Sequence, residues 1–167
     1  MSFDGIIFNK VTNLLKNKIL NCRINKIYQS SNTDYIFNLY SHSFSTNLII
    51  SVNNNASYIS LVNDINEEKL EITHFMSILY HHINNGVIED INQINNDRVL
   101  KLSINKINEL GISKNYNFYI ELTGKVTNLI LTKEDNTIIT EKNTDVDFYS
   151  DYTKAGFIEM MKSSMAQ

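Results

Sequence analysis

The chain has 167 residues and a mass of 19.3 kDa, enough for one domain with a real hydrophobic core and too short for a multidomain machine. Hydrophobic residues make up 43% and charged residues 20%, a balance that excludes an intrinsically disordered chain. The formal net charge of -3 excludes a surface that is basic overall, so any contact with nucleic acid must come from a local patch or a few polar residues.

The first half of the chain predicts one helix followed by an antiparallel meander. Apolar residues recur at steps of three and four from Ile7 through Val11, Leu14 and Leu15 to Ile19, so a helix with one buried face is expected, capped by Asp4 and ending near Leu20. Four runs rich in β-branched and aromatic residues then predict strands: Arg23 to Gln29, Tyr35 to Tyr40, Asn47 to Val52 and Ala56 to Leu61.

The second half begins with another helical period, from Glu67 to Asn85, which Asn85-Gly86 is expected to end. Further strands are predicted at Val87 to Ile94, Arg98 to Ile104, Tyr116 to Leu122, Asn128 to Thr132 and Thr137 to Thr140. We expect the folded domain to span residues 1–142. Residues 143–167 are predicted to form a polar connector and an amphipathic helix, whose methionine-rich face covers 157–165.

The predicted order of one helix, four strands, a second helix and five strands indicates an α+β fold. Its antiparallel strands are expected to form a two-layer β-sandwich or flattened barrel with flanking helices. The pattern does not fix the strand order.

Histidines and the single cysteine are the first candidates for chemistry. His74 and His82 are eight residues apart on the second predicted helix, and Glu71 precedes His74 by three, so a metal site and solvated helix histidines are both open; the second is favoured. Cys22, between a helix and a strand, is expected to be a buried core thiol and cannot form an intrachain disulfide, which suits the cytoplasm. No glycine-rich phosphate loop or nucleophile elbow is present, so we expect neither an enzyme nor a cofactor.

Asp97-Arg98 and Glu121 are the stronger candidates for a binding site. The pair Asp97-Arg98 separates two apolar runs, where charges must be satisfied. Arginine offers a planar fork of donors suited to phosphate or to the face of a base, whereas a turn ion pair is the slightly favoured structural alternative. Glu121 ends a predicted strand, and a carboxylate there is either a ligand contact or, more often, structural.

Four strings in register resemble the N-terminal domain of the NFACT family of ribosome-associated quality-control proteins, some of which carry an older fibronectin-binding label. They cover most of residues 1–141 and run Met1-Ser2-Phe3-Asp4-Gly5, Arg23-Ile24-Asn25-Lys26-Ile27-Tyr28-Gln29, Asn96-Asp97-Arg98-Val99-Leu100, and Glu121-Leu122-Thr123-Gly124 with Asn128-Leu129-Ile130-Leu131.

The resemblance implies that the chain binds large ribosomal subunits obstructed by peptidyl-tRNA and recruits tRNA, alanyl-tRNA among them, for C-terminal tailing of the stalled chain. It implies tRNA-binding roles for Asp97, Arg98, Asp4 and Glu121, the last of which belongs to the fourth family string. That string keeps Glu121, Leu122, Gly124 and Asn128 but has Thr123, Lys125, Val126 and Thr127 where the family has Met, Arg, His and Ser. No metal and no membrane partner are implied.

The resemblance leaves open the length of the whole protein and its binding partner. Complete family members continue into further domains, so the chain is expected to be a fragment or a truncated paralogue, and as a paralogue it is not expected to tail by itself. An interaction module acting through the methionine-rich face, or a fibronectin-binding adhesin, is the alternative to RNA binding. The domain is also similar in fold to the N-terminal domain of formamidopyrimidine-DNA glycosylases, but Ser2 and Phe3 stand where those enzymes have a nucleophilic Pro and a Glu, so glycosylase chemistry is not expected.

Overall fold

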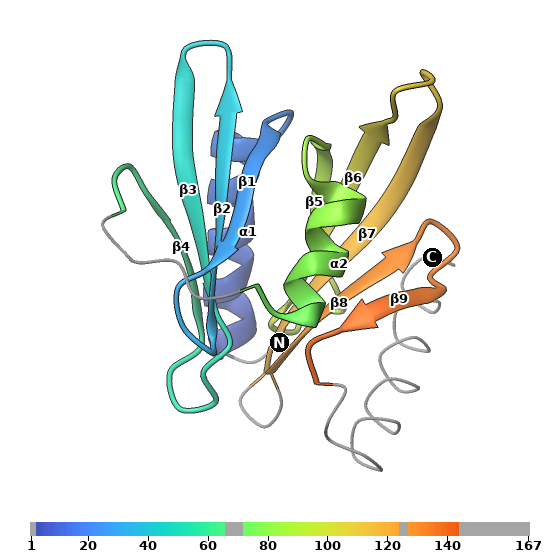
Figure 1. Cartoon of the computed structure of the whole chain (residues 1–167). Helices are drawn as coiled ribbons and strands as arrows, with labels where there is room; N and C mark the ends of the chain where they lie inside the picture. The colour runs from blue at the N-terminus through green and yellow to red at the C-terminus, as the bar shows by residue number, and fades with distance from the viewer. Residues whose placement is uncertain (1–2, 66–71, 124–126, 144–167) are drawn as a thin grey trace.

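The computed structural model describes residues 3–65, 72–123 and 127–143 (Figure 1). Side chains are described from residue 5 onward. Glu71 and the predicted helix at 153–165 lie outside this part of the chain.

The first half forms one helix and a four-stranded meander, as the sequence predicts. In chain order these are α1 (Phe3–Ile19), β1 (Arg23–Gln29), β2 (Asp34–Ser41), β3 (Phe44–Ser51) and β4 (Tyr58–Val62). The expectation that Asp4 caps the first helix is wrong, because α1 begins at Phe3 and Asp4 lies in its first turn.

The second half forms a helix and five strands. They are α2 (His74–Ile83), β5 (Val87–Gln93), β6 (Val99–Ile107), β7 (Ser113–Leu122), β8 (Thr127–Lys133) and β9 (Ile138–Glu141). The predicted start of the second helix is too early: Thr73 is the N-cap of α2, and its hydroxyl accepts a hydrogen bond from the Met76 amide.

All strands belong to one antiparallel sheet in the order β4-β3-β2-β1-β5-β6-β7-β8-β9. Its two halves meet at β1 and β5, where the ladder has the single pair Arg23 and Val87. The sheet bends at this seam, so the halves face each other and Phe37 of β2 stacks on Phe118 of β7 with ring centroids 5.5 Å apart. The predicted α+β antiparallel character is confirmed, and the two layers are halves of one continuous sheet.

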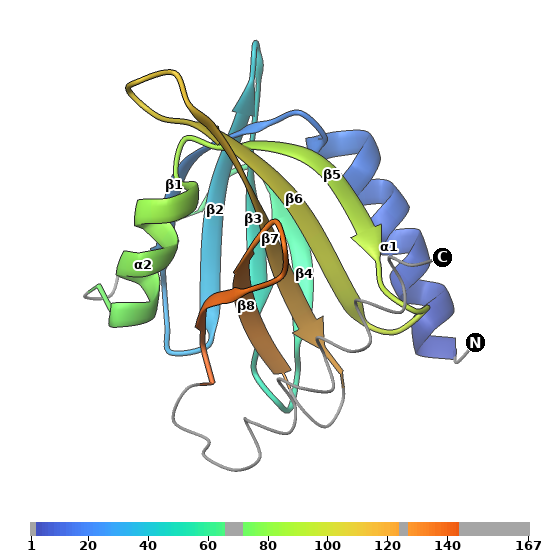
Figure 2. The same ribbon diagram turned by 90° about the vertical axis from the view of Figure 1, so that its right-hand side faces the viewer.

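The helices flank the sheet on opposite sides (Figure 2). The α1 helix packs on β5, and α2 packs on β1, β6 and β9. A single large core joins both sheet halves and both helices, and it includes Cys22, which is 1% exposed as predicted. Burial raises the pKa of the Cys22 thiol, as expected for an inert core cysteine.

The buried face of α1 differs in part from the predicted one. Phe8, Leu15 and Ile19 are buried in the core, whereas Ile7 is 45% and Leu14 is 56% exposed. Both sets obey a helical period, but they lie about 100° apart around the axis, and only the contact with β5 decides which set faces inward. None of the helices among the described residues has the length and apolar character needed to cross a membrane.

Candidate functional site

The loop between β5 and β6 is a tight turn that fixes Asp97 and Arg98. Asn95 and Asn96 both have left-handed backbone, with φ of 51° and 59°, and the Asp97 amide donates to the Ile94 carbonyl at 3.0 Å. Two successive left-handed residues with this hydrogen bond match a type I′ turn, which suits an antiparallel hairpin. Asp97 follows with an exposed side chain, and Arg98 is half-buried.

Arg98 is held by its side chain and by its backbone. Its Nη2 donates to the Ser57 hydroxyl at 3.2 Å, and its carbonyl accepts from the Leu122 amide at 2.8 Å. The side chain borders a cleft of about 290 Å³ between α1, β4 and the end of β7. Tyr58, 46% exposed, also lines this cleft, together with Ile7, Phe8, Val11, Ser57, Ile59 and Leu122.

Asp97 and Arg98 do not bind each other. Within the described residues, the ion pair closer than 4 Å is Lys16 with Asp90, at 3.9 Å. The favoured alternative of a turn ion pair is therefore wrong. Asp97 is exposed to solvent while Arg98 donates to Ser57, so the two side chains have separate surroundings.

Gln93 connects this turn to the start of α1, and the sequence gives no sign of that role. Its Nε2 donates to the Gly5 carbonyl at 3.1 Å and to the Asp97 carbonyl at 2.9 Å. Its Oε1 accepts from Asn9 Nδ2 at 3.1 Å. The first turn of α1, which carries Asp4, therefore lies beside the β5–β6 turn. Gln93 and Gly5 are 88 residues apart, so no local pattern reveals this contact.

Glu121 lies at the same end of the sheet but is buried. It pairs with Val99 on β6 and with Asn128 on β8, and it is 8% exposed. Burial raises the pKa of Glu121 to about 7; a hydrogen bond from Thr123 opposes the shift, and the charge of Glu141 adds to it. Its Oε2 has no hydrogen-bond donor among the described residues. We call this end of the sheet, with Gln93, Asp97, Arg98 and Glu121, the arginine end.

The histidines do not form a metal site in the described part of the chain. His74 is exposed at the start of α2, and His82 Nδ1 lies 2.8 Å from the Ile78 carbonyl of the same helix. No cluster of three or more potential metal ligands occurs among the described residues. His42 occupies the two-residue turn between β2 and β3, with φ of 45°.

Residues 4–148 match the family model for the NFACT N-terminal and middle domains. The Rqc2 homolog RqcH of Bacillus subtilis is 32% identical over 139 residues, which are 83% of this chain and 24% of that protein. The Rqc2 homolog RqcH of Streptococcus suis is 30% identical over 149 residues, 89% of this chain and 27% of that protein. The chain thus spans about a quarter of the length of these curated relatives.

Two solved structures have the same fold. The N-terminal part of the fibronectin/fibrinogen-binding protein from Streptococcus suis superimposes with a TM-score of 0.79 at 27% identity, covering 85% of this chain and 54% of that one. The N-terminal domain of fibronectin-binding protein PavA from Streptococcus pneumoniae gives 0.79 at 26% identity with the same coverage.

Proposed function

The chain belongs to the family of the NFACT N-terminal and middle domains, and from this membership we propose that it is a binding module for tRNA and the large ribosomal subunit in cytoplasmic ribosome-associated quality control. Its relatives of known name are Rqc2 homologs, which supports the ribosomal role. The module acts by binding and not by catalysis. Alanyl-tRNA and a large subunit carrying peptidyl-tRNA are the partners that the resemblance implies.

The observation that carries this proposal is the fixed position of Arg98 beside an open cleft. A guanidinium has five N–H donors, and the bond to Ser57 uses one of them. Tyr58 offers an exposed aromatic ring at the same cleft. Proteins recognise single-stranded RNA with such groups, since bases stack on aromatic rings and guanidinium planes. Asp97, exposed at the adjoining turn, adds an acceptor for a base edge or a ribose hydroxyl.

The rigidity of the arginine end also supports recognition. The type I′ turn, the Gln93 bridge and the Leu122–Arg98 hydrogen bond fix the backbone on both sides of Arg98. Groups that are held before binding lose less entropy when the ligand arrives. A few well-placed groups can therefore suffice for a chain whose net charge is -3.

A double substitution tests the proposal: Asp97→Ala with Arg98→Ala. We expect it to abolish binding to tRNA in a filter assay and co-sedimentation with obstructed large subunits, while the circular dichroism spectrum stays the same. Asp64→Ala with Lys26→Ala is the matched control, because it removes one exposed acid and one exposed base away from the turn. Equal binding by the two double variants would refute the assignment of Asp97 and Arg98.

Fibronectin binding is a second candidate, since both solved relatives are named fibronectin-binding proteins. Immobilised fibronectin tests it directly: saturable binding by the folded chain supports this role. The alternative interaction surface at 157–165 lies outside the described residues. For glycosylase activity, an assay on damaged DNA is the test, and we expect no product.

A further inference from the structure

Three lysines lie on β6, β7 and β8 of the second sheet half, which consists of β5 to β9. They are at the end opposite the arginine end. They are Lys106, Lys114 and Lys133, one from each strand. Lys106 and Lys114 are direct cross-strand partners, and Lys133 is the partner of Tyr116. Side chains alternate along a strand, so Lys106 and Lys133 share the inner face with the core residues Ile104 and Leu131, two positions earlier.

This arrangement is electrostatically unfavourable by itself. Like charges directly opposite each other on neighbouring strands destabilise a sheet. In the described part of the chain no carboxylate comes within 4 Å of these three lysines, and the charge of Asp135 acts on Lys133 only from beyond that distance. Lys106 Nζ donates to the His81 carbonyl at 3.0 Å, a neutral acceptor, and burial lowers the pKa of Lys106. An anion bound between the lysines would remove this cost.

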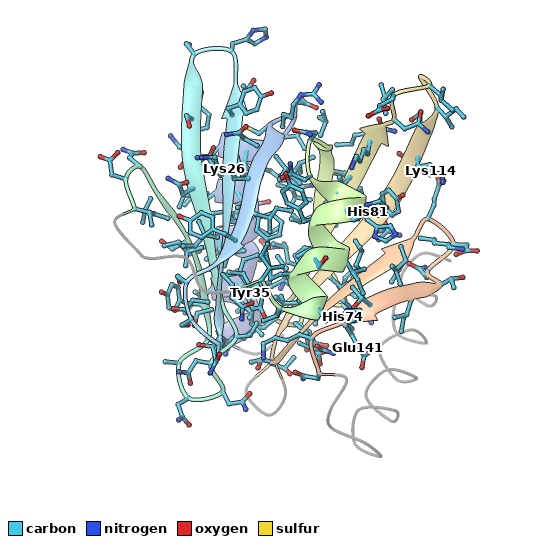
Figure 3. The ribbon with its side chains drawn as sticks, in the orientation of Figure 1. Lys26, Tyr35, His74, His81, Lys114 and Glu141 are labelled. Carbon is cyan, nitrogen blue, oxygen red and sulfur yellow. The ribbon has the colours of Figure 1, made fainter. Side chains whose placement is uncertain are left out.

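The end of α2 adds two histidines to the cluster. His81 of α2 lies across from Lys114 of β7 (Figure 3). Both residues line one hollow of about 260 Å³. The Ile78 carbonyl can only accept a hydrogen bond, so His82 Nδ1 is the donor in this contact and Nε2 is the other ring nitrogen. The ring centroids of His82 and Tyr116 lie 5.7 Å apart with an interplanar angle of 79°, an edge-to-face contact that holds both rings in place.

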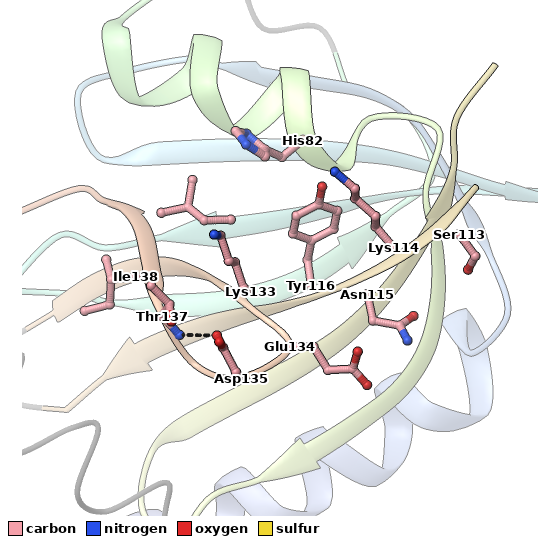
Figure 4. A pocket seen from close by; sticks show the side chains of 11 residues that line it. His82, Ser113, Lys114, Asn115, Tyr116, Lys133, Glu134, Asp135, Thr137 and Ile138 are labelled. Atoms are coloured by element: carbon pink, nitrogen blue, oxygen red, sulfur yellow. Dashed lines mark hydrogen bonds between the residues drawn. The ribbon is translucent and has the colours of Figure 1, made fainter. Parts of the chain in front are cut away.

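A larger open groove of about 800 Å³ continues from this hollow (Figure 4). His82, Lys114 and Tyr116 line both spaces, and Lys133 lines the larger one. Two carboxylates, Glu134 and Asp135, form the rim at the β8–β9 turn; Asp135 Oδ1 accepts from the Thr137 amide at 2.9 Å and so is part of the turn. We call the whole surface the lysine groove, defined by His81, His82, Lys106, Lys114, Tyr116 and Lys133.

The shape of the lysine groove favours an extended anion over a small one. Its cations come from three neighbouring strands, a span of roughly 10 Å at about 4.8 Å between strands, which exceeds one phosphate group. Neutral donors, Ser113 and Asn115, line the same groove. Lysine ammonium groups beside neutral donors are the typical partners of a nucleic-acid backbone.

We propose that the lysine groove binds the phosphate backbone of RNA, as a second contact apart from the arginine end. The RNA is the tRNA or ribosomal RNA of the proposed function, and the choice of RNA as the ligand rests on that function. The groove holds the backbone without selecting sequence, because its cations face phosphates and not base edges.

The test is a salt titration of binding to fluorescently labelled tRNA, measured by anisotropy. Lys114→Gln with Lys133→Gln should weaken binding about tenfold at low salt. It should also make the slope of log K against log salt shallower by about 1.8, since each lost phosphate contact removes about 0.9. The matched control is Lys18→Gln with Lys26→Gln, two exposed lysines on α1 and β1. Glu134→Gln removes a repelling charge and should strengthen binding.

The outcomes separate this inference from the proposed function. A slope equal to that of the control double variant overturns the lysine groove, even if Asp97→Ala with Arg98→Ala abolishes binding and so supports the arginine end. A shallower slope for Lys114→Gln with Lys133→Gln supports the groove. If Asp97→Ala with Arg98→Ala then leaves binding unchanged, the arginine end is refuted. Absence of RNA binding by the unaltered chain at low salt overturns both, and binding of poly-glutamate in its place would assign the groove to an acidic protein.

Discussion

The two ends of the second sheet half use the same strands in opposite ways. At the arginine end, Arg98 and Gln93 are tied by hydrogen bonds and Glu121 is buried. At the other end, Lys114 and Lys133 are exposed and have no carboxylate within 4 Å among the described residues. Fixed groups suit the recognition of particular bases, whereas exposed cations suit a repeating backbone. One sheet can therefore separate recognition from general affinity.

The turns that close the two ends differ in the same sense. The β5–β6 turn is a tight type I′ turn next to the core. The β6–β7 hairpin instead extends past the core, with Ile107 64% and Leu110 84% exposed, and it turns at Gly111 with φ of 79° (Figure 2). The glycine adopts this left-handed backbone without strain. Both ends are attached to the same core, so a change in the core is expected to affect both of them.

The largest expected effect comes from Phe118→Ala, which removes the ring between the two ends. Phe118 is fully buried and stacks on Phe37, so its loss should lower the free energy of unfolding by about 3–5 kcal/mol. Urea denaturation followed by circular dichroism measures the change, and Tyr80→Ala, at a 52% exposed position, is the control. Because both ends depend on this core, RNA binding through both should weaken together; loss at one end alone would contradict a shared core.

Glu121→Gln sharpens the comparison through pH. The folded pKa of Glu121, about 7, lies above its ordinary value of 4.5, so the folded chain holds a proton that the unfolded chain has lost. Stability is therefore fully present below about pH 4.5 and falls as pH rises through 7, by about 3 kcal/mol in total. The glutamine variant should lack this loss and be more stable than the unaltered chain at pH 8.

The measurement is urea unfolding of both chains at pH 5 and pH 8, with the difference between the chains as the result. Glu109→Gln, an exposed carboxylate at the far hairpin, is the control and should leave the pH dependence unchanged. Parallel pH curves for the Glu121→Gln and unaltered chains would show that the buried carboxyl is not the source.

Asparagine explains how much of the fold the sequence could predict. Asn is over-used in this chain, so from the sequence alone a scattered Asn is weak evidence for a turn. In the structure Asn21, Asn85, Asn95, Asn96 and Asn136 all adopt left-handed backbone. Asn tolerates that region better than other non-glycine residues, so these positions are true turn signals. The strands were still predicted to within a few residues, because their β-branched and aromatic runs are local.

The candidate site was less predictable, because its partners are distant in sequence. The motifs predicted Asp97, Arg98 and Glu121, and the structure brings them to one end of the sheet. Gln93, Ser57 and the lysine pair depend on tertiary contacts and strand register. A one-residue shift of one strand would place Lys106 and Lys114 on opposite faces of the sheet. No local pattern could therefore reveal the groove.

Gln93→Leu tests whether the arginine end depends on its bridge. The substitution removes the hydrogen bonds to Gly5, Asp97 and Asn9 and should cost about 1.5–4.5 kcal/mol of stability, since each of the three bonds contributes about 0.5–1.5 kcal/mol. It should also weaken tRNA binding without changing its salt slope, because no cation is lost. Glu89→Leu, at an exposed position on the same strand, is the control. A changed slope would show that the two ends are not separate.

Lys114→Glu has the smallest expected effect on stability and the most informative sign. It converts the opposed pair Lys106–Lys114 into an acid–base pair, which should raise the free energy of unfolding by a few tenths of a kcal/mol, up to about 1. The same change places a negative charge in the lysine groove and should weaken RNA binding more than Lys114→Gln does. Denaturation and anisotropy on the same preparation measure both quantities. Selection for stability alone would favour an acid at position 114. Higher stability together with weaker RNA binding would therefore mean that the paired lysines are kept for binding. A decrease in both stability and RNA binding would mean that Lys114 has a structural role.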